Sequence, residues 1–398
     1  MRSSTSSSDA EAAAVLGLQG NAFVRGPLQP RGAPSSTNAA LNAHRGEARV
    51  VPAVPWPQVF VGMLVMLALL LGAWEYALRG LGLRAGDLDD GRDYWAVERR
   101  KVDSGPRDSV VIIGDSRMLY DTDLATWQRL TGRRPIQLAL PATNAQNFLH
   151  DLATDEHFAG LLVIGTAELS YFRDGDGGSS DVLEYVKSQT PSQKSGQMIY
   201  KELSRHLAFL DTDYTLFRVI ERREWADREG VDGPYGEVWK LSESTDDRQS
   251  WLWDRLEKDP YLLEHARRVW KAVYPSEPVA ADVVERTIAR AKADVQRIRA
   301  RGGEVVWVRP PSSGVILERE HARFPRAKIW DRLLGETGCF GVHFEDYPQM
   351  QNLSLPDWSH LARRSALGYT QAYVQVLADH VAWLKSHAVT DAAVQRTP

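Results

Sequence analysis

The sequence of 398 residues contains one cysteine, Cys339, which excludes an internal disulfide and argues against a thiolate metal site. Its formal net charge of -4 argues against a surface that binds nucleic-acid phosphates, because such a surface needs an excess of basic residues. The chain has no zinc-type Cys/His spacing, no P-loop and no GxGxxG fingerprint. We therefore expect no metal, no cofactor and no nucleic-acid partner.

Long apolar runs are also absent, apart from one between residues 56 and 79. Its uninterrupted core, 59–74, extends with its flanks to about 20 residues, enough to cross the hydrocarbon layer of a bilayer. Trp56, Trp74 and Tyr76 lie near its ends, where interfacial aromatic residues are common. A buried helix or a cleaved signal peptide is the alternative. The long preceding segment and the lack of an A-x-A site favour a single transmembrane helix, 56–79.

The charges on either side of this run predict its orientation. Residues 1–55 carry the arginine excess, namely Arg2, Arg25, Arg31, Arg45 and Arg49. Arginine-rich flanks stay in the cytoplasm, so we expect a cytoplasmic N-terminus and a main domain outside the cytoplasm of a bacterium, anchored in the inner membrane. The Ser, Ala, Gly and Arg content of 1–55 further predicts that this segment is disordered.

From residue 107 onwards, apolar β-type runs alternate with helical patterns. The expected strands are 109–116, 135–142, 160–168, 303–311 and 341–347, and the expected helices are 118–130, 144–157, 281–300 and 362–386. Nearly continuous apolar strands joined by helices are typical of a parallel sheet covered on both faces. We therefore expect an α/β domain with three α/β/α layers, built from 107–172 and 281–388.

Three segments interrupt or flank this alternation. We expect a linker or helical extension at 80–106, a charged helical insertion at 173–280 and a tail at 389–398. The insertion holds several tryptophans, namely Trp225, Trp239, Trp251, Trp253 and Trp270. Stacked indoles can form a platform for sugars, but such residues more often form the core of their own segment. We favour the core interpretation for most of them.

Gly114-Asp115-Ser116 directly follows the first strand, at the edge where parallel sheets place their sites. Ser116 therefore belongs either to a simple turn and helix cap or to a nucleophilic site. A serine nucleophile needs a base and a group that orients the base. Asp357 and His360, three residues apart, supply both within one turn, although Asp357 also suits an N-cap and His360 the surface. Their order along the chain favours a Ser116–His360–Asp357 triad.

On these motifs the chain resembles the SGNH (GDSL-type) hydrolase superfamily. Gly114-Asp115-Ser116 is similar to the first block of the family, and Asp357-x-x-His360 is similar to the last. The resemblance covers about residues 107–170 and 300–385. It implies a flavodoxin-like fold in which Ser116 is the nucleophile, His360 the general base and Asp357 the orienting acid.

The resemblance also implies an oxyanion hole made by the backbone N–H groups of Ser116 and Ala142, the latter standing where the family has glycine. The family has Gly-x-Asn-Asp in its third block, whereas this chain has Gly165-Thr166-Ala167-Glu168. Losing an oxyanion donor such as that asparagine costs about 3–4 kcal/mol in the transition state. Asn144 or Asn147 offers a substitute amide, although each also suits a helix cap or a solvent-exposed position.

A membrane anchor followed by an SGNH-like domain is similar to the accessory proteins that O-acetylate extracellular polysaccharides. The resemblance implies an acyl esterase or O-acetyltransferase acting on polysaccharide or another acyl-ester substrate of the cell envelope. The implied partners are the membrane and a membrane-bound acyl donor protein. The missing asparagine favours a second hypothesis, in which the domain has lost turnover and acts as a scaffold in a polysaccharide export assembly.

Overall fold

The computed structural model of the chain describes residues 54–88, 90–222 and 238–387. The chain divides into two units, one that ends at Leu64 and one that begins at Val65. The described residues of the first unit, 54–64, lead into and begin the helix α3 (Trp56–Gly80). The predictions of disorder for 1–55 and of a tail at 389–398 fall outside the described residues, except at positions 54 and 55.

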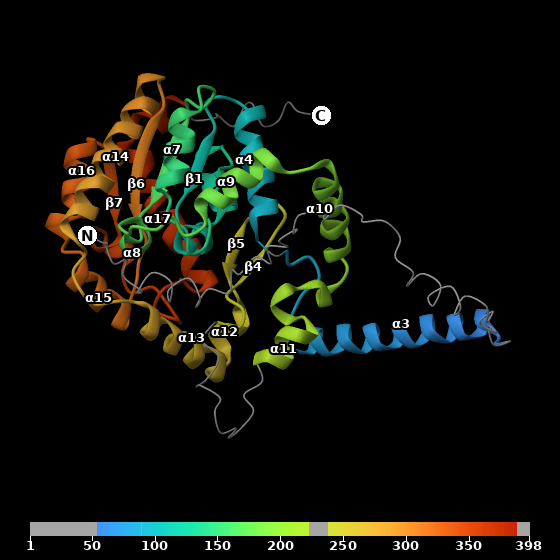
Figure 1. Ribbon diagram of the computed structural model, residues 1–398. Coiled ribbons are helices and arrows are strands. Elements are labelled where there is room, and N and C mark those ends of the chain that lie inside the picture. The colour runs from blue at the N-terminus through green and yellow to red at the C-terminus, as the bar shows by residue number, and fades with distance from the viewer. Residues whose placement is uncertain (1–53, 89, 223–237, 388–398) are drawn as a thin grey trace, which may run out of the picture. The chain divides into compact units, whose positions relative to one another are not determined.

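The second unit contains a five-stranded sheet in the order β2-β1-β3-β6-β7 (Figure 1). Its strands are β1 (Val110–Ile113), β2 (Ile136–Gln137), β3 (Leu161–Gly165), β6 (Glu304–Arg309) and β7 (Phe340–His343). Every neighbouring pair is parallel, and Val111 of β1 lies opposite both Ile136 of β2 and Leu162 of β3. Four strands fall within their predicted segments, and β7 overlaps the fifth but begins one residue before it, so the predicted α/β class and parallel sheet are confirmed.

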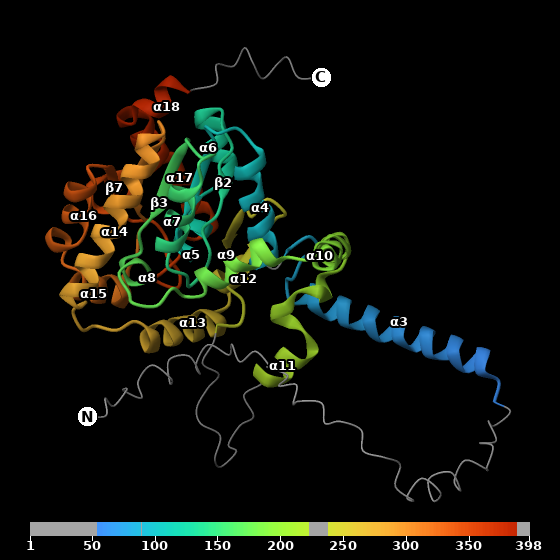
Figure 2. The same cartoon turned by 45° about the horizontal axis from the view of Figure 1, so that its top comes forward.

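Helices cover both faces of the sheet (Figure 2). One face carries α7 (Gln146–Thr154), α14 (Ala281–Ala300) and α16 (Trp330–Thr337), and the other carries α5 (Ser116–Asp121), α6 (Leu124–Thr131) and α17 (Arg363–His380). Val111 and Ile113 of β1 face the first set, whereas Val110 and Ile112 face the second. Because strand residues alternate in direction, a continuous apolar run fills two cores at once.

The other elements pack around this sheet or belong to the insertion. Around the sheet lie α4 (Arg92–Ser104), α8 (Glu168–Tyr171), α15 (Gly314–Arg323), η4 (Arg326–Lys328), η5 (Phe344–Asp346), η6 (Pro348–Met350) and α18 (Ala382–Ser386). The insertion comprises α9 (Ser179–Ser188), α10 (Pro191–Ser204), η2 (Ala208–Leu210), η3 (Thr212–Tyr214), α11 (Leu216–Arg222), β4 (Ser242–Ser244), β5 (Ser250–Leu252), α12 (Asp254–Lys258) and α13 (Pro260–Val273). The insertion is therefore not purely helical, since β4 and β5 form an antiparallel hairpin.

Two of the predicted helices are divided in the structure. The predicted helix 118–130 is α5 followed by α6, because the Asp123 side chain accepts a hydrogen bond from Thr126 N–H at 2.6 Å and begins a new helix. The predicted helix 362–386 is α17 followed by α18, separated at Val381, whose backbone is extended. The predicted helix 281–300 coincides with α14.

Close packing between β3 and α5 at Gly165 gives a first prediction. A Cβ at Gly165 would lie 1.6 Å from Cγ and 2.8 Å from Cβ of Met118, which is fully buried. We expect Gly165→Ala to destabilise the protein by about 1–3 kcal/mol because the core is overpacked. Thermal unfolding of the full chain in detergent measures this loss.

The matched control is Gly335→Ala in α16, where an added Cβ meets nothing within 4 Å. Since alanine favours helix more than glycine, this variant should be as stable as the parent or more stable. Equal stability of the Gly165→Ala variant and the parent would contradict the packing of α5 on β3.

Candidate active site

Ser116 lies where β1 passes into α5. Gly114 follows the strand with a φ of 152°, and Asp115 caps α5 by accepting a hydrogen bond from Arg117 N–H at 3.1 Å. The same carboxylate accepts a hydrogen bond from the Ser170 hydroxyl at 2.6 Å, which ties α5 to α8 after β3. The junction is thus a capped turn, and it also holds Ser116, half-buried, at the carboxyl edge of the sheet.

The structure brings Ser116, His360 and Asp357 together. His360 Nε2 lies 2.9 Å from Ser116 Oγ, and His360 Nδ1 lies 2.7 Å from Asp357 Oδ2. The other oxygen of Asp357 accepts hydrogen bonds from the backbone N–H groups of Ser359 at 3.1 Å and His360 at 2.8 Å. This turn precedes α17 instead of forming its first turn, and it buries Asp357 and His360 almost completely.

The charge state of Asp357 sets the direction of these hydrogen bonds. Burial raises the pKa of Asp357, but the charge of His360 and the hydrogen bonds from His360 and Trp270 together bring it below its usual range. An ionised carboxylate accepts only, so Nδ1 of His360 carries a proton. When the imidazole is neutral, Nε2 is therefore its acceptor and faces the Ser116 hydroxyl. This arrangement is the one by which a histidine activates a serine.

Trp270 belongs to the same site, although the sequence analysis favoured the insertion's own core for most of its tryptophans. Its indole Nε1–H on α13 donates to Asp357 Oδ2 at 3.0 Å, and its ring lies 5.9 Å from the His360 ring. Trp253, in contrast, is buried in a cluster formed largely by the insertion, as expected, and Trp225 lies outside the described residues. Trp270 and Asp357 are 87 residues apart, so no local sequence pattern shows that they are in contact. The sequence therefore does not distinguish Trp270 from Trp253.

Ala142 adopts the backbone conformation that a glycine would favour. Its φ is 56°, in the left-handed region, and its carbonyl accepts a hydrogen bond from Arg173 Nη2 at 2.7 Å. The alanine at this position therefore has a left-handed backbone conformation, in which glycine is more common. The other expected backbone donor, the N–H of Ser116, is the first of α5 and so has no acceptor within that helix.

The side chain of Asn144, an expected substitute donor to the oxyanion, is hydrogen-bonded to the loop that begins the insertion. Its amide donates to the backbone carbonyls of Arg173 at 3.4 Å and Gly175 at 3.3 Å, and its backbone N–H donates to Asp176. The alternative, Asn147, donates to Ser179 and Ser180, both at 3.0 Å. Both amides hydrogen-bond to the segment that begins the insertion, and the role of either as a substitute oxyanion donor stays a prediction.

A buried ionic network joins the two halves of the triad. Glu320 of α15 accepts from Arg117 at 2.6 Å with one oxygen and from Arg309 at 2.6 Å with the other. Arg309 also pairs with Glu168 at 3.1 Å, and Arg117 Nε lies 3.3 Å from Ser359 Oγ. Because Arg117 follows Ser116 and Ser359 precedes His360, this network fixes both sides of the contact between Ser116 and His360.

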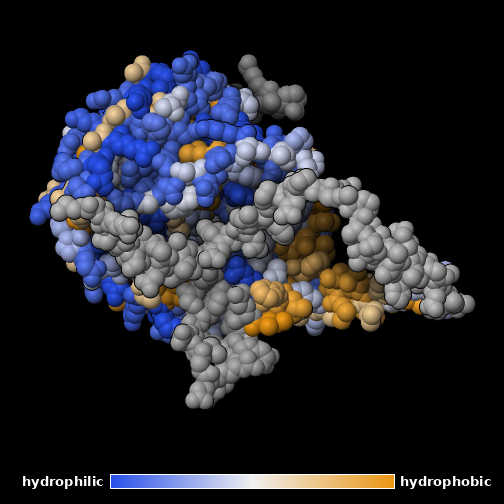
Figure 3. Space-filling view, in the orientation of Figure 1, coloured by the Kyte–Doolittle hydropathy of each residue, from blue (hydrophilic) through white to orange (hydrophobic). Residues whose placement is uncertain are grey.

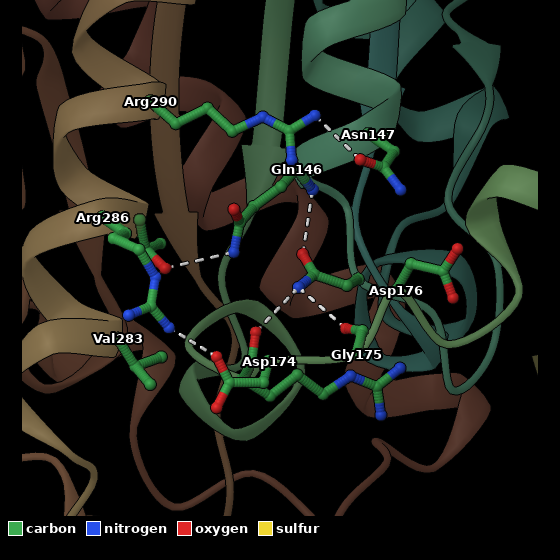
Figure 4. A pocket seen from close by; sticks show the side chains of 11 residues that line it. Gln146, Asn147, Asp174, Gly175, Asp176, Val283, Arg286 and Arg290 are labelled. Atoms are coloured by element: carbon green, nitrogen blue, oxygen red, sulfur yellow. Dashed lines mark hydrogen bonds and ion pairs between the residues drawn. The ribbon is translucent and has the colours of Figure 1, made fainter. Parts of the chain in front are cut away.

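A polar cavity of about 360 Å³ lies beside the site, between α7, α14 and the loop at 173–176 (Figure 4). Its polar lining includes Asn144, Gln146, Asn147, Arg173, Arg286 and Arg290. Arg173 connects it to the site through its hydrogen bond to the Ala142 carbonyl, whereas Ser116 does not line it. Amide and guanidinium groups donate hydrogen bonds that hydroxyl and carboxylate oxygens accept.

The buried network gives a prediction about stability and pH. Burial raises the pKa of Glu320, but the charges of Arg117 and Arg309 lower it from the ordinary value of 4.5 to about 2. A lowered pKa contributes stability that is complete above pH 4.5 and is lost as the pH falls towards 2. We expect Glu320→Gln to cost about 3–5 kcal/mol at neutral pH, since two buried guanidinium groups lose their counter-charge.

Denaturant unfolding of parent and variant between about pH 7 and pH 3 measures this difference, which should shrink as the pH falls. The control is Glu285→Gln, which removes an exposed ion pair with Arg332 and should change stability little at any pH. A Glu320→Gln loss that stays constant with pH would contradict the ionised state of Glu320.

Comparison with known proteins does not assign this chain to a family. The sequence matches no family model, and a search of curated proteins finds no significant relative. Among the described residues, no group of three or more His, Cys, Asp and Glu side chains is arranged to hold a metal ion. The chemistry of the site therefore has to be argued from the contacts of Ser116, His360 and Asp357 themselves.

Proposed function

We propose that the protein is a membrane-anchored SGNH-like enzyme of acyl-ester chemistry. The observation that carries this proposal is the chain of contacts from Ser116 Oγ through His360 to the buried Asp357. The sheet order β2-β1-β3-β6-β7 also supports it, because it is the order of a flavodoxin-like fold when the strands are renumbered without the hairpin.

In the proposed mechanism, Ser116 Oγ attacks the carbonyl carbon of an acyl ester while His360 Nε2 takes the hydroxyl proton. The carbonyl electron pair moves onto its oxygen, where the N–H groups of Ser116 and Ala142 are the proposed donors. When this intermediate collapses, the bond to the alcohol breaks and the alcohol leaves with the proton from His360. The acyl group stays on Ser116 as an ester.

The second half repeats these steps with a new nucleophile. His360 takes a proton from water in an esterase, or from a sugar hydroxyl in a transferase, as the oxygen of that molecule attacks the acyl ester of Ser116. Ser116 recovers its proton from His360 as it leaves. Asp357 stays ionised throughout and stabilises the imidazolium that forms in each half.

The proposed substrate is a polysaccharide or another acyl ester of the bacterial envelope. One helix, Trp56–Gly80, is long and apolar enough to span a membrane, and none of its apolar window is buried in the protein. With the arginine-rich segment in the cytoplasm, the site would lie outside the inner membrane, where a membrane-bound acyl donor protein would supply the acyl group. An enzyme held at the membrane suits a substrate that is assembled there.

A scaffold without turnover is the second candidate function. It is favoured by the lack of a side-chain donor at Ala167, since the amides of Asn144 and Asn147 are bound elsewhere. In that case Ser116 would only be the first residue of α5, after its N-cap Asp115. Reactivity of the serine separates the two candidates.

The proposal predicts that Ser116 reacts covalently with a fluorophosphonate probe. The probe requires a serine activated by a base, so we expect the full chain in membranes to be labelled and the Ser116→Ala variant not to be labelled. Ser180→Ala, which changes an exposed serine of α9, should be labelled like the parent. A parent protein that resists the probe would favour the scaffold.

The hydrogen bond from Trp270 predicts a change in the pH profile. Trp270→Phe removes a donor to an ionised group, an interaction typically worth about 1.5–3 kcal/mol, and with it one of the contacts that hold Asp357 in place. Because His360 is then oriented less well, kcat/KM for a small aryl acetate should fall about tenfold or more. Without the hydrogen bond from Trp270, the negative charge of Asp357 is less stabilised by other groups and therefore stabilises the His360 imidazolium more strongly. The acidic limb of the kcat/KM profile should therefore move to higher pH.

Trp251→Phe is the matched control, since the indole of Trp251 donates to Glu243 instead of the triad. It should leave the pH profile unchanged. A Trp270→Phe enzyme with lower activity but an unmoved acidic limb would mean that Trp270 only packs against the site.

A further inference from the structure

Two helices of the insertion, α10 and α11, expose most of the large apolar side chains on the surface of the domain. After residue 81, the described part of the chain exposes ten such side chains, and six of them lie on these two helices. The six are Met198, Ile199, Leu203, Leu216, Phe217 and Ile220. Phe217 and Met198 are 75% and 72% exposed, and Figure 3 shows hydrophobic residues gathered where α11 lies. Such a concentration is characteristic of an interaction surface.

The segment between these helices is bound to the last turns of α3. The Glu75 carboxylate accepts hydrogen bonds from the backbone N–H groups of Ala208 at 3.0 Å and Phe209 at 2.8 Å. Arg79 donates to the carbonyl of His206 at 3.1 Å, and Leu78 is fully buried in the core of the insertion. The end of α3 is therefore part of the folded domain and not a flexible tether.

The length of α3 sets the depth of this attachment. From Trp56 to Trp74 the helix extends about 27 Å at 1.5 Å per residue, close to the hydrocarbon thickness of about 30 Å. Glu75 and Arg79 would then lie at the lipid headgroups. Ala208 and Phe209, which bind Glu75, must lie at the same level, and α10 ends four residues before Ala208 while α11 begins seven residues after Phe209.

We propose that the apolar side chains of α10 and α11 enter the boundary between headgroups and acyl chains of the outer leaflet, so that the domain is docked on the lipid surface. This inference rests on the proposed membrane span of α3. Short helices with exposed apolar side chains bind in the plane of this boundary, and an exposed lysine such as Lys194 of α10 favours anionic lipids. Because the segment between α10 and α11 is bound to the end of the membrane-spanning helix α3, we take lipid, and not a second protein, to cover these apolar side chains.

The depth of single labelled positions tests this proposal in the full chain. Cys339 is the only cysteine and is buried, so a cysteine introduced at an exposed position accepts an environment-sensitive fluorophore selectively. Phe217→Cys and Met198→Cys report on the two helices, Leu67→Cys on the middle of α3, and Leu367→Cys on an exposed apolar position of α17. The proteins are reconstituted in vesicles of phosphatidylethanolamine and phosphatidylglycerol, with or without lipids that carry a spin-label quencher near the headgroup.

We expect a blue shift and quenching by these lipids at positions 217 and 198, and neither at 367. Position 67 should show a blue shift and respond to a quencher deep in the acyl chains. If the fluorophore at position 67 is blue-shifted but those at 217 and 198 are not quenched, the proposed docking of α10 and α11 is wrong, while α3 still spans the membrane. A blue shift at 217 without lipid quenching would indicate a protein partner or a second copy instead. A water-exposed signal at 67 would overturn the span and the docking together.

Discussion

Two arginines from different parts of the sheet share one buried carboxylate, that of Glu320. Arg117 follows the nucleophilic position and Arg309 ends β6, so Glu320 connects α5, β6 and α15 below the site. A buried ion pair of this kind persists only if all its members are hydrogen-bonded, because unpaired buried charges cost several kcal/mol. The separation of Ser116 and His360 depends on this network, since Arg117 also reaches Ser359.

The parts of the structure that follow from local rules could be predicted from the sequence. Five apolar runs indicate five strands, and the carboxyl ends of parallel strands meet at one edge, which brings Ser116 near the turn at Asp357. The spacing of Asp357 and His360 allows a contact within one turn, and the structure has that contact. The α/β class was therefore predictable, together with the assembly of the three candidate residues.

Contacts between distant segments could not be predicted in this way. Nothing in the sequence near Glu320 shows that it pairs with Arg117, 203 residues earlier. The amide of Asn144 has the right chemistry for an oxyanion donor, but the carbonyls of Arg173 and Gly175 take it. The predicted helix 118–130 is divided because a local cap at Asp123 outweighs the apolar periodicity that continues across it.

The insertion meets the site at both of its ends. Arg173, at its start, holds the carbonyl of Ala142, and Trp270, near its end, supplies a hydrogen bond to Asp357. The hydrogen bonds of Asp357 and of the Ala142 carbonyl are therefore complete only when the insertion is folded, and a replacement for the insertion would have to provide an equivalent donor to Asp357.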